Sequence, residues 1–144
     1  MKLDDLKNEA KQDLQIDETL LDDESLRTIS LQGKWHDILA QEDLYLVKLR
    51  TDLAKEKNFK MKYFKGKLTK KELSERGLPQ FLENLTIAEQ NSHLDADDEL
   101  IKLSQRVAFQ EKKIDYVKGI LDTIRQRTWG IKNAIEYRKF IKGT

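Results

Sequence analysis

Residues 100–138 read LIKLSQRVAFQEKKIDYVKGILDTIRQRTWGIKNAIEYR and carry the most regular pattern in this chain of 144 residues. Alternate steps of three and four residues from Leu100 meet twelve positions, nine of them apolar, and their neighbours are rich in Lys, Arg, Glu and Asp. Sustained heptads of this kind are typical of a helix that buries one seam against other helices. Besides two polar residues, Gln110 and Thr128, and Arg138 at its end, the seam consists of Leu100, Leu103, Val107, Ile114, Val117, Leu121, Ile124, Ile131 and Ile135.

Composition bears on what this seam packs against. Hydrophobic residues make up 38% and charged residues 37% of the chain, whereas globular domains average about 45–50% and about 25%. A monomer of this composition has a thin core, so we predict that the seam joins subunits through Val107, Ile114, Val117, Leu121, Ile124, Ile131 and Ile135. The alternative, that the seam packs inside one chain, stays open. Because Gly130 interrupts the pattern, a kink is expected near Trp129 and Gly130.

The rest of the chain also predicts helices, because one proline and six glycines leave long uninterrupted stretches and strand-like alternation is missing. A short helix is expected to end near Leu14, and a long one to run from the low twenties to the high sixties, fraying at Gly66. Gly77 and Pro79 mark the clearest break. The predicted fold is all-α: long helices in a bundle with a coiled-coil-like C-terminal oligomerisation region. One domain is expected, with an N-terminal segment over residues 1–77, a connection over 78–93 and an oligomerisation segment over 94–144.

The net charge of +1 conceals alternating charged blocks. Residues 1–47 carry five basic and twelve acidic side chains, and residues 48–77 carry eleven basic and four acidic ones. Residues 78–111 are again acidic, and residues 112–144 are again basic. Such segregation gives a nearly neutral protein a basic surface that can bind polyanions.

Residues 55–71 combine cations with aromatic rings, because eight lysines meet one glutamate with Phe59, Tyr63 and Phe64 among them. Single-stranded nucleic acid is bound by cations that neutralise phosphates and by aromatic faces on which bases stack. Lysine favours backbone contact over reading of base edges, so binding without sequence preference is expected. Phe64 continues an apolar stripe and is assigned to the core. The predicted DNA-binding residues are Lys55, Lys57, Lys60, Lys62, Tyr63, Lys65 and Lys67.

No residue pattern points to catalysis or to a cofactor. The two histidines, His36 and His93, have no metal-ligand spacing, and cysteine is absent. The acidic run 95–99 lacks the glycine and the final glutamate of a calcium loop, so we interpret it as a helix cap. No Gly-rich phosphate loop is present. We therefore expect a protein that is not an enzyme, with no cofactor, no metal and no membrane-spanning segment.

The chain resembles the UvsY recombination mediators of T-even-like bacteriophages along nearly its whole length. The resemblance is carried by Met1–Leu6, Lys11–Asp13, Ile16–Thr19, Lys34-Trp35, Met61–Gly66, Gly119–Ile124 and Arg127–Lys132. It implies a ring of six or seven subunits that binds single-stranded DNA. It also implies a phage RecA-like recombinase and the phage single-strand-binding protein as partners, in the cytoplasm of the infected bacterial host. In this picture the mediator helps the recombinase to displace the single-strand-binding protein during recombination and repair.

A second function fits the same residues. A coiled-coil structural or adaptor protein would also have a long apolar seam, and its lysine patch would bind an acidic protein partner. The acidic block 1–47 of a neighbouring subunit is one such partner. Binding of polyanions in trans, and its dependence on salt, separates the two functions.

Overall fold

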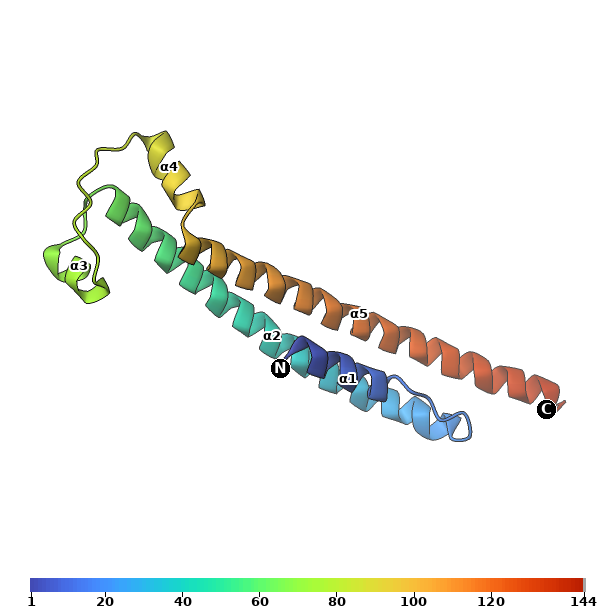
Figure 1. Ribbon diagram of the computed structural model, residues 1–144. Helices are drawn as coiled ribbons and strands as arrows, with labels where there is room; N and C mark the ends of the chain where they lie inside the picture. Colours follow the sequence, from blue (N-terminus) through green and yellow to red (C-terminus); the bar gives the residue numbers. More distant parts are fainter. Residues whose placement is uncertain (144) are drawn as a thin grey trace. The chain divides into compact units, whose positions relative to one another are not determined.

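The structure, a computed structural model, describes residues 1–143, and within these residues the chain is all-helical (Figure 1). The helices are α1 (Leu3–Asp13), α2 (Leu21–Phe64), α3 (Lys70–Arg76), α4 (Ile87–Asp95) and α5 (Asp98–Ile141). The predicted all-α class is therefore confirmed. None of the helices in the described residues is long and apolar enough to cross a membrane.

Helix α2 begins and ends close to where its sequence predicts. Asp22, Asp23 and Glu24 occupy its first turn, where carboxylates interact favourably with the helix dipole. At the other end the N–H of Lys67 donates to the carbonyl of Lys62 at 2.9 Å. This reversal requires a residue with positive φ, which Gly66 supplies at 69°.

Short helices follow, each fixed by local capping. Thr69 and Glu72 form a reciprocal capping box at the start of α3, and Gly77 ends this helix with φ 63°. Thr86 caps α4 by accepting a hydrogen bond from the N–H of Glu89. The carboxylate of Asp97 accepts from the N–H of Leu100 at 3.0 Å and so starts α5, as expected for the acidic run.

Helix α5 is continuous from Asp98 to Ile141, so the expectation of a kink near Trp129 and Gly130 is wrong. A glycine inside a helix costs about 1 kcal/mol relative to alanine. Burial of Ile124 and Ile131 on either side of Gly130 outweighs that cost, because each buried aliphatic side chain contributes about 1.5–3 kcal/mol.

The chain divides into two compact units. We call residues 1–44, together with the chain from residue 111 onward, the terminal unit, and residues 45–110 the central unit. The long helices α2 and α5 contribute to both units, so the units do not coincide with the consecutive segments that the sequence predicts.

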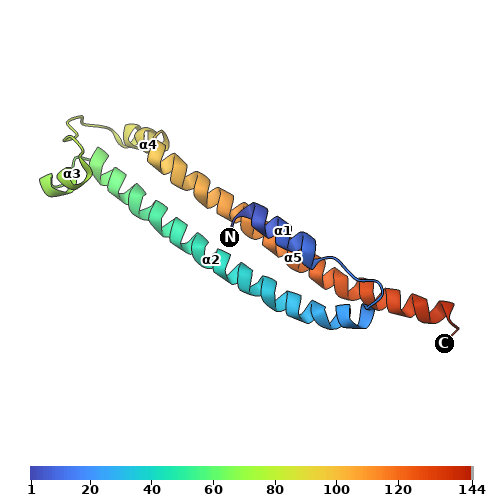
Figure 2. The same ribbon diagram turned by 60° about the horizontal axis from the view of Figure 1, so that its bottom comes forward.

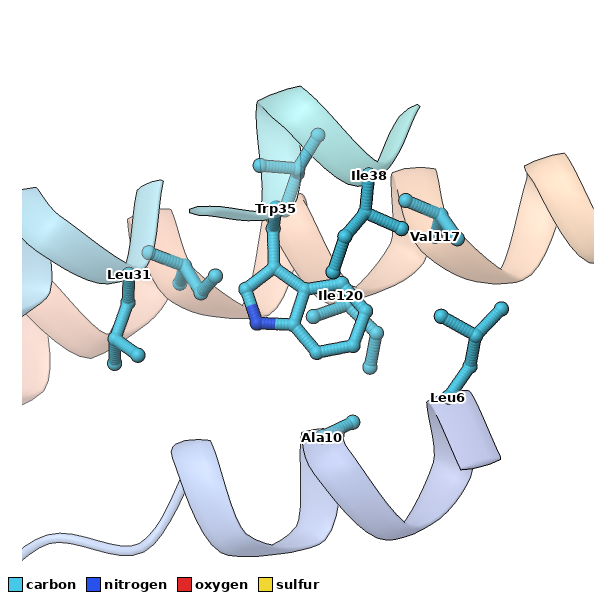
Figure 3. Packing of buried hydrophobic residues seen from close by; sticks show 9 residues of the cluster. Leu6, Ala10, Leu31, Trp35, Ile38, Val117 and Ile120 are labelled. Carbon is cyan, nitrogen blue, oxygen red and sulfur yellow. The ribbon is translucent and has the colours of Figure 1, made fainter. Parts of the chain in front are cut away.

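Trp35 lies at the centre of the core of the terminal unit (Figure 3). It is fully buried, and its indole N–H donates to the carboxylate of Asp13 at 3.0 Å. Helix α1 packs beside α2 and α5 in both views of the chain (Figures 1 and 2) and covers Trp35 with Leu6 and Ala10. The remaining buried members of the cluster are Leu31, Ile38, Val117, Ile120, Leu121 and Ile124.

Most of the predicted oligomerisation residues lie inside the chain itself. Ile114, Val117, Leu121, Ile124 and Ile131 are at most 4% exposed in the single chain. Val107 and Ile135 are half-buried. The seam is therefore covered by the chain's own helices, as in the alternative left open by the sequence, and its five buried side chains have almost no surface to offer another subunit.

Candidate nucleic-acid interface

The exposed lysines of the central unit form a row along α2. Lys48, Lys55 and Lys62 are seven residues apart and all exposed. Seven residues make almost two helical turns with a rise of about 10 Å. These three ammonium groups therefore start from one face of the helix at regular intervals, as contact with a phosphate backbone requires. We call them the lysine row.

Two further lysines follow the end of α2. Lys65 and Lys67 flank Gly66, where the chain leaves the helix, and both are exposed. They continue the positive charge of the lysine row beyond Lys62. The structure thus keeps Lys55, Lys62, Lys65 and Lys67 of the predicted site on the surface and adds Lys48, which sequence reasoning missed. The seven-residue spacing was the signal that identifies Lys48.

Lys60 does not belong to this exposed group. Its ammonium group is buried and lies 3.2 Å from the carboxylate of Asp97 and 3.7 Å from that of Glu99. Lys60 therefore joins α2 to the start of α5 within the central unit, and its charge is compensated inside the chain. Lys57 is exposed but lies on another side of α2, at the edge of a groove that Leu53, Leu94 and Leu100 also line.

The aromatic residues near the lysine row pack against one another. The ring of Tyr63 lies 5.6 Å from that of Phe64 and 5.4 Å from that of Phe81. The ring of His93 lies 5.1 Å from that of Phe64. The hydroxyl of Tyr63 donates to the carbonyl of Pro79 at 2.9 Å. Tyr63 thus fastens the segment after α3 to the end of α2, and its half-buried ring is engaged within the unit.

Phe59 is covered in a different way. The guanidinium of Arg76 lies 3.8 Å from the centre of its ring, and the same group donates two hydrogen bonds to Glu56, at 2.9 and 2.6 Å. These bonds hold the pKa of Glu56 below and that of Arg76 above its ordinary value. Helix α3 is thereby attached to α2 by a bidentate ion pair and a cation–π contact.

The geometry determines what this surface can do. It offers mobile ammonium groups to phosphates, but the neighbouring rings are engaged and do not form an open platform for bases. Electrostatic binding of a polyanion with little base recognition is the expected chemistry. Among residues 1–143 no group of three or more Asp, Glu or His side chains is placed to hold a metal ion.

Comparisons with known proteins give one consistent result. The sequence model of the family described as "Recombination, repair and ssDNA binding protein UvsY" matches residues 9–144. The recombination protein uvsY of Enterobacteria phage T4 is 28% identical over 148 residues, covering 99% of both chains.

Solved structures agree with this match. Two crystal structures of the bacteriophage T4 recombination mediator protein UvsY superimpose with TM-scores of 0.81 and 0.83, at 24% and 23% identity. They cover 97% and 99% of this chain, which in turn covers 98% of each of them. At this identity the likeness establishes the fold.

Proposed function

Because the chain belongs to the UvsY family of recombination, repair and single-stranded-DNA-binding proteins, we propose that it is a recombination mediator. In this proposal a homo-oligomer binds single-stranded DNA without sequence preference. It then helps to load a RecA-like recombinase in place of the single-strand-binding protein. The observation that supports DNA binding most directly is the lysine row of α2, with Lys65 and Lys67 after it.

The physical argument concerns phosphate contacts. Each lysine that neutralises a phosphate of a single strand releases about 0.7 of a counterion, so the affinity falls steeply with salt. Five lysines per subunit give modest binding by themselves. An oligomer repeats them, and linked sites gain affinity through their effective concentration. The proposal therefore needs assembly as well as charge, and the protein itself needs no catalytic group.

Fluorescence anisotropy with labelled oligo-dT at several salt concentrations tests the lysine row. Replacing Lys48, Lys55 and Lys62 together with Ala is expected to weaken binding of all sequences alike. It should also reduce the slope of log K against log salt by about 2 for each subunit in contact with the strand. These side chains are exposed, so the fold should be unaffected.

The matched control replaces three exposed lysines away from the row: Lys2, Lys7 and Lys11. This variant loses the same charge, so a change in net charge alone would affect both variants equally. Equal affinities of the row variant and the wild type would exclude the row from the site. Tight binding of an acidic protein with no binding of oligo-dT would favour the adaptor function instead.

A further inference from the structure

Helix α2 has a second apolar face in the terminal unit, which the chain leaves uncovered. Leu26 and Ile29 are each 69% exposed, and Leu44 is 71% exposed. Their spacing places them on the side of the helix opposite the buried residues Leu31 and Trp35. With the small residues between them they form what we call the α2 stripe: Leu26, Ile29, Gly33, Ala40 and Leu44.

Gly33 is not explained by any contact within the chain. It lies inside a helix, it does not have positive φ, and a Cβ placed on it would meet nothing within 4 Å. Its cost of about 1 kcal/mol to the helix is therefore not offset inside the terminal unit. Ala40, seven residues later, is also small and exposed. Small residues at this spacing between large apolar ones let another helix approach closely.

The α2 stripe is bordered by acidic side chains. Asp22, Asp37 and Asp43 are exposed beside it. The two basic residues in this stretch of the helix are engaged elsewhere: Arg27 lies 3.1 Å from Glu24, and Lys34 lies 2.7 Å from Asp13. A surface of this charge disfavours DNA and favours an apolar partner with basic borders.

The end of α5 has these properties. Trp129 and Phe140 are 65% and 80% exposed and lie on the side of the helix opposite the buried Ile124 and Ile131. Tyr137 is exposed next to them and borders an apolar groove of about 500 Å³. Residues 125–142 contain six basic side chains and one acidic one. We call Trp129, Tyr137 and Phe140 the α5 aromatic face.

We propose that the α5 aromatic face of one subunit docks on the α2 stripe of a second copy of this chain. The inference rests on the homo-oligomer of the proposed function and names the surfaces that form it. The two surfaces belong to the same chain, are both apolar and have opposite charge at their borders. A contact between two different surfaces leaves one of each free on every added subunit, so assembly continues until a ring closes.

Light scattering coupled to size-exclusion chromatography tests the α2 stripe. Leu44→Lys is expected to raise the subunit dissociation constant on the order of 100-fold, because it places a charge in an apolar contact. The measured mass should fall toward the 17.0 kDa of one chain. The matched control is Leu82→Lys, since Leu82 is an equally exposed leucine in the central unit. Circular dichroism of both variants verifies that the helices are retained.

Mixing two variants tests the pairing itself. The double variant Trp129→Glu, Phe140→Glu should also be small, but it keeps an intact α2 stripe, whereas Leu44→Lys keeps an intact α5 aromatic face. An equimolar mixture is therefore expected to form a discrete dimer. A mixture that stays monomeric would overturn the pairing, and an unchanged mass of Leu44→Lys would overturn the role of the stripe. A monomeric wild type would reject the homo-oligomer. Anisotropy with oligo-dT tests DNA binding separately.

Discussion

The buried ion-pair network of Arg127 offers a quantitative test of how the terminal unit is held together. Arg127 is 5% exposed and pairs with the carboxylate of Glu24. Its guanidinium also donates to the hydroxyl of Thr28 at 3.1 Å and to the backbone carbonyls of Asp13 and Gln15, at 3.3 and 3.0 Å. One side chain of α5 thus satisfies the end of α1 and the beginning of α2.

The expected cost of Arg127→Ala follows from these contacts. Removing one partner of a buried ion pair costs about 3–5 kcal/mol, because the other charge stays buried without compensation. Here Arg27 also contacts Glu24, at 3.1 Å, and donates to the same two carbonyls. We therefore expect the lower end of that range, about 3 kcal/mol. Arg27→Ala alone should cost about 1 kcal/mol or less, since Arg27 is partly exposed and Arg127 remains.

The double variant distinguishes a shared network from two independent contacts. Without both arginines Glu24 has neither of these partners, so the double variant should lose about 1–2 kcal/mol more than the two single losses together. Urea unfolding followed by circular dichroism, at one fixed protein concentration, measures these free energies. Arg125→Ala is the control, because Arg125 is exposed and pairs only with Asp122 on its own helix. Additivity within about 0.5 kcal/mol would refute the shared network.

Two further predictions concern the stability of the helices. Hydrogen bonds from Arg76 lower the pKa of Glu56 from 4.5, so the pair stabilises the fold above that pH and ceases to do so as the pH falls through the lowered value. Glu56→Gln should therefore be less stable than wild type at pH 7, and urea midpoints should converge below pH 4.5; a constant difference would contradict the assignment. Gly119→Ala should raise the free energy of unfolding by up to about 1 kcal/mol, because Gly119 lies inside α5 with nothing within 4 Å of a Cβ. A lower urea midpoint of this variant would show that Gly119 is needed.

Local signals made most helix boundaries predictable. Gly66, Gly77 and the acidic run 95–99 each act through the backbone conformation or the capping of their own turn, and each lies at a helix end. Helix α4 was missed, although Thr86 and Glu89 have the spacing of a capping box. The kink predicted at Gly130 failed because burial on both sides of a glycine depends on the partner helices, which a local pattern does not contain.

Contacts between distant segments account for the rest. A run of lysines does not reveal that Lys60 meets Asp97, 37 residues later in the chain, or that Arg76 covers Phe59. The heptads of residues 100–138 identify which side of α5 is buried. They do not state what covers it, because a helix of the same chain and a helix of another subunit require the same apolar spacing. The uncovered α2 stripe became visible only once the first apolar face of α2 had been assigned to the core.

The proposed DNA surface and the proposed assembly surfaces lie in different units of the chain, and this has a consequence for how variants behave. The lysine row belongs to the central unit, whereas the α2 stripe and the α5 aromatic face belong to the terminal unit. Replacing the lysines should change the salt slope and leave the mass of the assembly unchanged. Replacing Leu44 should reduce the mass and leave each subunit with its own phosphate contacts, so affinity would fall through lost effective concentration alone. A protein built this way can retain its hold on a polyanion of any sequence, because affinity depends on how many subunits are joined and not on the recognition of a base.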